Sequence, residues 1–128
     1  MLTQNWLARN TFFLKTVFYF YLIFVFVVTQ IPPKKTKIMG EIPFVKFLRE
    51  FNFTDKIVHF GLFFILAILY FFRKGFLNVF LMVFGISFLV EILQLTLPFE
   101  RSFDWYDLLA NGLGTIAAIT LLKKYSSV

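Results

Sequence analysis

Four long runs of apolar residues, each bounded by charged residues or proline, constrain the fold of this chain more than any other feature. With their polar shoulders the runs cover residues 11–31, 56–73, 76–97 and 106–122. A helix needs about 20 residues to cross a bilayer, and each run reaches or approaches that length. Backbone polar groups must be paired within lipid, and the runs lack the apolar–polar alternation of barrel strands. The sequence therefore predicts an all-α membrane protein with four transmembrane helices.

The composition excludes the main soluble alternatives. Apolar residues make up 59% of a 128-residue chain, and 21 residues are phenylalanine. A soluble domain of this size cannot bury so much apolar surface, so we expect residues 1–128 to form a single membrane domain whose main partner is the lipid bilayer. The net charge of +6 does not indicate nucleic-acid binding, because the basic residues lie at the ends of the apolar runs. The absence of cysteine excludes disulfides and thiol chemistry.

The first run and the loop after it each allow two interpretations. Residues 11–31 follow basic residues as a signal peptide would, but the run is long for one and no small-residue cleavage site follows, which favours an uncleaved span. Pro32 and Pro33 end this helix. In the loop, apolar residues recur at helical spacing over residues 44–51, which predicts a short helix lying in the membrane interface. The alternative is an ordinary loop that touches the membrane.

Polar residues inside or beside the spans converge at one membrane face. They lie where the second span begins, where the third ends and where the fourth begins, and successive helices cross in opposite directions. Topology alone therefore gathers them into one candidate pocket, formed by Asp55, Lys56, His59, Glu91, Gln94, Arg101, Asp104, Asp107 and Asn111.

Helical phase supports this grouping. Asp104, Asp107 and Asn111 are three and four residues apart, so they share a stripe along the fourth span. Glu91 and Gln94 share a stripe with Ser87 on the third. The fourth span also carries a ridge of small residues, at which a neighbouring backbone can approach closely: Ala110, Gly114 and Ala118.

Each candidate also has a structural interpretation. Glu91 lies deep in its span, where an acidic group usually marks a working site, but it could instead pair with Arg101 or Lys56 to lock the bundle. Asp104 could simply cap the fourth helix. Lys56 could extend its ammonium group to the interface, and His59 could be a hydrogen-bonded interfacial residue. We expect Arg101 to pair with Asp104 or Asp107.

These residues together resemble a family signature. The pattern is Asp55-Lys56-x-x-His59, Glu91-x-x-Gln94, and then Arg101-x-x-Asp104-x-x-Asp107-x-x-x-Asn111-x-x-Gly114. It resembles the VanZ-like family of small bacterial membrane proteins over about residues 54–118, with Ala118 standing where many relatives carry another small residue, often glycine. The resemblance implies a polytopic protein of the bacterial cell envelope. The family's founding member is linked to low-level resistance to the glycopeptide antibiotic teicoplanin.

Three function classes remain open. The pocket could bind an envelope lipid or ligand and so affect the response to glycopeptides, with Lys56, His59 and Arg101 facing an anion. It could instead be the site of an intramembrane enzyme that acts on a lipid-linked envelope substrate, or the chain could be a structural subunit of a larger complex. The spacing matches no standard metal motif, so no metal site and no cofactor are assigned. Basic residues crowd the ends of the spans on the side of the termini, which predicts a bacterial inner-membrane protein with both termini in the cytoplasm.

Overall fold

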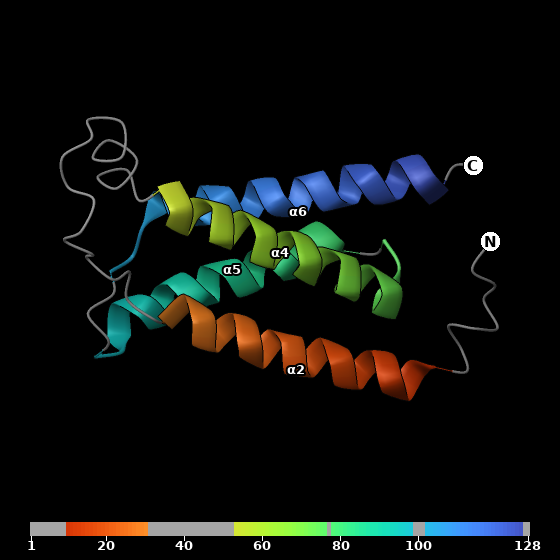
Figure 1. Cartoon of the computed structure of the whole chain (residues 1–128), viewed down its shortest axis with the longest axis horizontal. Coiled ribbons are helices and arrows are strands. Elements are labelled where there is room, and N and C mark those ends of the chain that lie inside the picture. Colours follow the sequence, from red (N-terminus) through yellow and green to blue (C-terminus); the bar gives the residue numbers. More distant parts are fainter. Residues whose placement is uncertain (1–9, 31–52, 77, 99–101, 127–128) are drawn as a thin grey trace.

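The computed structural model describes residues 10–30, 53–76, 78–98 and 102–126, and over these ranges the chain is mostly α-helical, with no strands (Figure 1). The elements are α2 (Thr11–Gln30), α4 (Phe53–Lys74), α5 (Val79–Thr96) and α6 (Trp105–Ser126). All four helices are long and apolar enough to cross a membrane. The prediction of an all-α membrane protein with four transmembrane helices is confirmed. The interfacial helix predicted at residues 44–51 lies outside the described residues.

The turn between α4 and α5 is longer than the sequence predicted. The third span was expected to begin at residue 76, but α5 begins at Val79. Gly75 and Asn78 both have left-handed backbone conformations, with φ of 71° and 57°. Glycine adopts this conformation without strain and asparagine tolerates it better than most residues, so the chain turns here before the next helix starts.

Local features of the sequence also explain where α5 and α6 end at their C-termini. Leu97 is extended after the last turn of α5, as expected for a residue that precedes proline. α6 continues past the predicted end at residue 122 and carries Lys123 and Lys124 in its last turn. Cations at a helix C-terminus interact favourably with its dipole, which suits a helix that ends outside the apolar layer.

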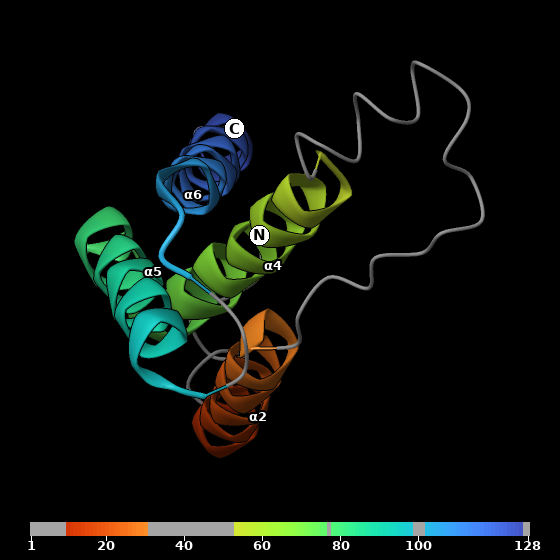
Figure 2. The same cartoon turned by 90° about the vertical axis from the view of Figure 1, so that its left-hand side faces the viewer.

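The helices form an antiparallel bundle in which α4 is central. α4 packs against α2, α5 and α6, and α6 packs against α4 and α5. Viewed nearly end-on, α6 and α2 lie on opposite sides of α4, and α5 completes the bundle (Figure 2). α2 begins and α6 ends at one end of the bundle (Figure 1). The opposite end holds the start of α4, the end of α5 and the start of α6.

The closest packing occurs between α4 and α6. A Cβ atom placed on Gly114 would lie 2.3 Å from the backbone oxygen of Phe60, which is far inside van der Waals contact. Ala118 is fully buried on the same predicted ridge, and Ala110 is buried as well. Small residues on α6 therefore let the two backbones approach, which fixes the distance between the helices that carry most of the candidate site.

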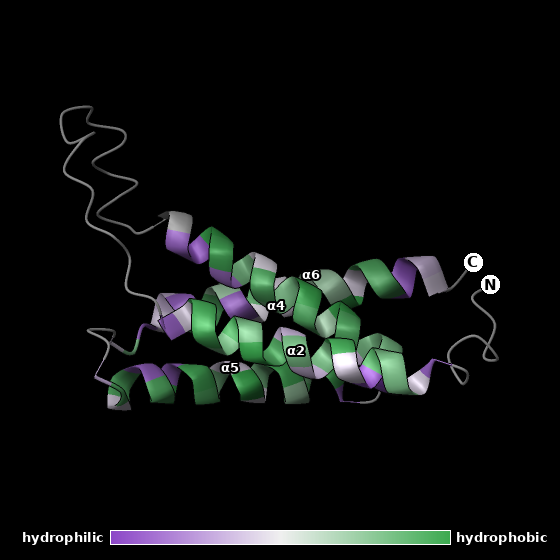
Figure 3. Ribbon diagram, turned by 60° about the horizontal axis from the view of Figure 1, so that its bottom comes forward, coloured by the Kyte–Doolittle hydropathy of each residue, from purple (hydrophilic) through white to green (hydrophobic). Residues whose placement is uncertain are grey.

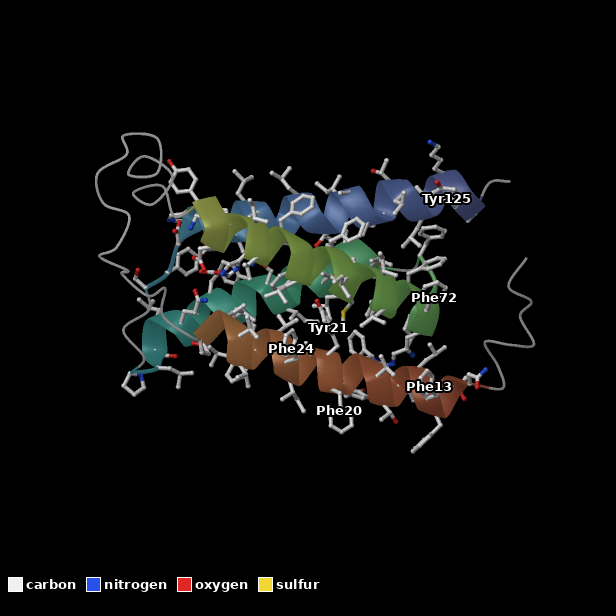
Figure 4. All side chains as sticks on the ribbon, in the orientation of Figure 1. Phe13, Phe20, Tyr21, Phe24, Phe72 and Tyr125 are labelled. Carbon is white, nitrogen blue, oxygen red and sulfur yellow. The ribbon has the colours of Figure 1, made fainter. Side chains whose placement is uncertain are left out.

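The outer surface of the bundle is apolar over most of its length. Hydrophobic residues cover the middle of the helices, whereas hydrophilic residues gather near their ends (Figure 3). Phe13 and Phe20 of α2 point away from the bundle, while Tyr21 points toward α4 and donates a hydrogen bond to the Leu62 carbonyl at 2.8 Å (Figure 4). An apolar exterior of this kind suits contact with lipid chains.

Candidate functional site

The predicted pocket residues that the structure describes lie at one end of the bundle, where α4 and α6 begin and α5 ends. Their burial is unusual for polar side chains. His59, Glu91, Gln94, Asp107 and Asn111 are buried almost completely, with at most 2% of their surface exposed. Asp55, Lys56 and Asp104 are partly exposed at the rim. Arg101 lies outside the described residues.

Lys56 is the cation that binds two of the aspartates. Its Nζ atom donates to Asp104 Oδ2 at 2.6 Å and to Asp107 Oδ1, and it lies 4.0 Å from Asp55 Oδ2. From the sequence, Lys56 was expected to face an anion, to pair with Glu91 or to reach the interface. The expected pairing of Arg101 with Asp104 or Asp107 stays a prediction, because Arg101 lies outside the described residues. In the described part of the chain, Lys56 links the start of α4 to the start of α6 through two carboxylates.

His59 belongs to a second, deeper set of polar contacts. Its Nδ1 atom lies 2.9 Å from Asn111 Oδ1, and Asn111 Nδ2 donates to Ser87 Oγ at 2.8 Å. An amide oxygen can only accept, so His59 Nδ1 carries the proton of this bond. The bond turns the other ring nitrogen, Nε2, toward Asp107, whose Oδ2 lies 3.6 Å away. Ser87 was placed on the predicted stripe of α5 but was not among the candidate site residues.

Glu91 and Asp104 fix the start of α6. Asp104 Oδ1 accepts the Tyr106 backbone N–H at 2.8 Å, so Asp104 is the N-cap that the structural interpretation predicted. Glu91 Oε2 accepts the backbone N–H of Asp104 at 3.2 Å, a contact to the helix terminus. The pairing of Glu91 with Arg101 stays a prediction, because Arg101 lies outside the described residues. Burial opposes ionisation of Asp104, but hydrogen bonds from Lys56 and Tyr106 outweigh it and lower the Asp104 pKa below its ordinary value.

Gln94 faces a different neighbour from the rest of the group. Its Nε2 atom donates to the Thr29 backbone carbonyl of α2 at 2.7 Å. The Oε1 atom of the same side chain is buried and has no hydrogen-bond partner within the described ranges. Gln94 therefore ties the end of α5 to the end of α2, at the border between the polar group and the more apolar half of the bundle.

One trio within the group has the composition of a metal site. Single ligand atoms of Asp55, His59 and Asp107 all lie within 4.8 Å of one another. Two of these residues come from α4 and one from α6, which is why no sequence spacing revealed the group. We refer below to Asp55, Lys56, His59, Glu91, Asp104, Asp107 and Asn111 as the polar cluster.

The comparisons with known proteins place the chain in a family. No match was found among curated proteins or among solved structures. A family model described as VanZ/LLP1 matches residues 12–125. The match extends well beyond the region of the sequence signature and takes in nearly all of the four helices. The chain therefore belongs to the VanZ/LLP1 family.

Proposed function

We propose that the polar cluster binds the head group of a cell-envelope lipid or a related envelope ligand, and that this binding affects the response to glycopeptide antibiotics. Two considerations support the proposal. The chain is a VanZ-like membrane protein, and that family is linked to glycopeptide resistance. The cluster also lies at the end of a bundle, where lipid head groups meet the protein.

The observation that carries the proposal is the concentration of buried ionisable groups at this end. Glu91 and Asp107 are almost fully buried together with His59. Burying charged groups opposes stability, and ionisable residues within transmembrane segments usually mark working sites. Capping accounts for Asp104, but a cap does not require the deeper residues on the same face of the bundle.

The charge of the cluster indicates which ligand group it favours. Among the described residues it holds the carboxylates of Asp55, Glu91, Asp104 and Asp107 against one lysine, Lys56. Because Lys56 already bonds to two of these carboxylates, it is poorly placed to attract an anion. The cluster therefore favours a ligand group that is cationic or donates hydrogen bonds, such as the amine of an aminophospholipid.

A neighbouring apolar groove suits the remainder of a lipid. It lies between α2 and α5, has a volume of about 290 Å³, and is lined by residues that include Leu22, Phe26, Leu89 and Leu93. Gln94 and its Thr29 contact follow the last of these lining residues along the two helices. An acyl chain in the groove would leave its head group near the polar end of the bundle.

Native mass spectrometry of the full chain tests the binding. We expect phosphatidylethanolamine to be retained more strongly than phosphatidylglycerol. Asp107→Asn should weaken that retention about 10-fold, since a hydrogen bond to a charged group contributes about 1.5–3 kcal/mol. Thr120→Val, an exposed change on the same helix, serves as the matched control. Equal retention by the wild type and Asp107→Asn would contradict the proposal.

The antibiotic response needs a separate measurement. Expression of the wild-type chain in a susceptible strain should raise the inhibitory concentration of teicoplanin, and Asp107→Asn should abolish the rise at equal protein level. If lipid is bound but the inhibitory concentration is unchanged, the binding part of the proposal stands and the resistance part falls.

A second candidate function is an intramembrane enzyme that acts on a lipid-linked envelope substrate. The observation that favours it is the buried His59 beside Asp107, held by Asn111, which is an arrangement suited to general acid–base chemistry. Product formation from a lipid-linked substrate that His59→Gln abolishes, with helix content intact, would favour this function. Binding without turnover would favour the first.

We also propose that the start of α2 and the end of α6 face the cytoplasm of a bacterial cell, so that the polar cluster faces outward across the inner membrane. The chain contains no cysteine, so in each single-cysteine variant the introduced residue is the only thiol that can be labelled. An impermeant thiol reagent should label Ser102→Cys in intact cells and should label Ser126→Cys only after permeabilisation. The reverse pattern would overturn this orientation.

A further inference from the structure

We propose that Asp55, His59 and Asp107 bind a divalent transition-metal ion of the Zn²⁺ type at the interface of α4 and α6. No sequence motif assigns this site, and it does not depend on the proposed lipid function. The three ligand atoms lie within 4.8 Å of one another and come from residues that are buried or half-buried.

The distances within the trio suit a shared ion better than direct bonding. His59 Nε2 and Asp107 Oδ2 are 3.6 Å apart, which is too long for a good hydrogen bond. Two ligands of a tetrahedral ion with bonds of 2.0–2.2 Å are separated by about 3.4 Å. Asp55 and His59 are four residues apart on α4, so both side chains lie on the same face of that helix.

Asp107 can bind the ion without releasing Lys56. Its Oδ1 atom bonds to Lys56, whereas its Oδ2 atom is the one that faces His59. The two carboxylate oxygens therefore have separate roles. Lys56 positions Asp107 from one side, with its ammonium group also bonded to Asp104, and the ion would be bound from the other side.

The surroundings of His59 are those of a metal-binding histidine. Metal-bound histidines almost always donate their second ring N–H to an oxygen, which fixes the ring and directs the lone pair of the other nitrogen at the metal. The Asn111 amide oxygen plays this part for His59 Nδ1, and Asn111 is itself held by Ser87. Asn111 and Ser87 are both fully buried, so the packing of α4, α5 and α6 fixes the orientation of the His59 ring.

Charge and ligand type select the class of ion. Formally, the cluster carries four carboxylates and one ammonium, so a divalent ion would reduce its net charge from −3 to −1. An imidazole ligand favours zinc and similar transition metals over Mg²⁺ or Ca²⁺, which prefer oxygen alone. Three protein ligands leave at least one coordination position open for water or for an oxygen of a bound head group.

Metal binding can be measured on the purified full chain without any activity assay. After chelator treatment and dialysis into detergent, the protein should bind one Zn²⁺ per chain in competition with a fluorescent chelator. Co²⁺ should give the visible absorption of a four- or five-coordinate site. Mg²⁺ at the same concentration should not compete. Failure of the wild type to bind either transition metal would overturn the proposal.

Variants distinguish coordination from simple charge attraction. His59→Gln and Asp55→Asn should each weaken Zn²⁺ binding by more than about 100-fold, and Asn111→Ala by about 10–100-fold, the usual effect of losing an outer-shell partner. Glu91→Gln removes a carboxylate of the cluster that is not a ligand, so its effect should be smaller than that of Asp55→Asn. Thr120→Val should bind as the wild type does.

Folding is checked by circular dichroism for each variant. Asp55 is half-buried at the start of α4, so Asp55→Asn tests the site even if His59→Gln fails to fold. Equal loss of affinity in Glu91→Gln and Asp55→Asn would indicate attraction by charge alone and would contradict the assigned ligands.

Discussion

α2 and α6 both run the length of the bundle, yet they are held in opposite ways. α2 is among the most apolar of the four spans and is the least buried, whereas α6 is the least apolar and the most buried. The buried residues of α6 include Asp107, Asn111, Gly114, Thr115 and Ala118, which are polar or small. Those of α2 are few: Phe18, Val25, Thr29 and Gln30.

The difference follows from the solvent. Lipid chains are as apolar as leucine, so an apolar helix gains little by leaving lipid for the bundle. Close backbone approach and hydrogen bonds between helices are what a bilayer cannot supply, and α6 offers both. Between these two helices, the one with the lower hydropathy is packed and carries part of the site, and the more apolar one faces lipid.

The strongest test of this comparison is Gly114→Ala. The added Cβ would meet the Phe60 backbone oxygen at 2.3 Å, so α6 must move away from α4. We expect the free energy of unfolding in detergent to fall by about 3 kcal/mol, the upper end for overpacking. The matched control is Gly85→Ala on α5, where a Cβ meets nothing within 4 Å. Similar stability of the two variants would show that the α4–α6 approach is not what holds α6.

The second test removes the cation that joins the same two helices. Lys56→Met keeps an unbranched side chain one atom shorter than lysine but leaves the Asp104 and Asp107 carboxylates without their shared lysine. Breaking a fully buried pair costs about 3–5 kcal/mol, and the partial exposure of Lys56 and Asp104 reduces the expected loss to about 2 kcal/mol. Lys124→Met, an exposed change at the end of α6, is the control. An unchanged unfolding midpoint in Lys56→Met would contradict the assigned ion pair.

Much of the architecture was predictable from the sequence, because lipid imposes simple rules. Four apolar runs gave four helices, and the alternation of crossings brought the polar residues to one end. Helical phase placed Asp107 and Asn111 on one stripe, and both are buried in the structure. These predictions depend on spacing along single helices, which a sequence displays directly.

Contacts between helices were harder to predict. Phase shows which face of a helix a residue occupies but not which residue lies opposite, so the pairing of Lys56 with Asp104 and Asp107 was not predicted. The predicted pairing of Arg101 with these aspartates stays a prediction, because Arg101 lies outside the described residues. In the same way, the ridge at Gly114 was visible, but its neighbour Phe60 was not. Asp55, His59 and Asp107 come together only because α4 and α6 approach closely, which no local motif records.

A smaller effect is expected at the start of α6. Asp104→Ala removes the cap on the Tyr106 N–H and one partner of Lys56. We expect a loss of about 1 kcal/mol in the free energy of unfolding, the usual cost of losing an N-cap. Asp104→Asn retains a capping oxygen but loses the charge, so it should recover part of the loss. If both variants are equally destabilised, the ionic contact to Lys56 matters more than the cap.

The smallest effects should come from α2, and they separate its two faces. Tyr21→Phe removes the hydrogen bond to the Leu62 carbonyl of α4. Hydrogen bonds between membrane helices contribute about 0.6 kcal/mol on average, so we expect the free energy of unfolding to fall by that amount. Phe20→Leu, at the adjacent position, changes a side chain that is 71% exposed on the outer face. Because Phe20 faces apolar solvent whether or not α2 is packed, we expect no measurable change in the unfolding midpoint. A Phe20→Leu variant less stable than Tyr21→Phe would mean that the outer face of α2 is covered by protein, such as a second copy of the chain, and that α2 is held by packing as α6 is.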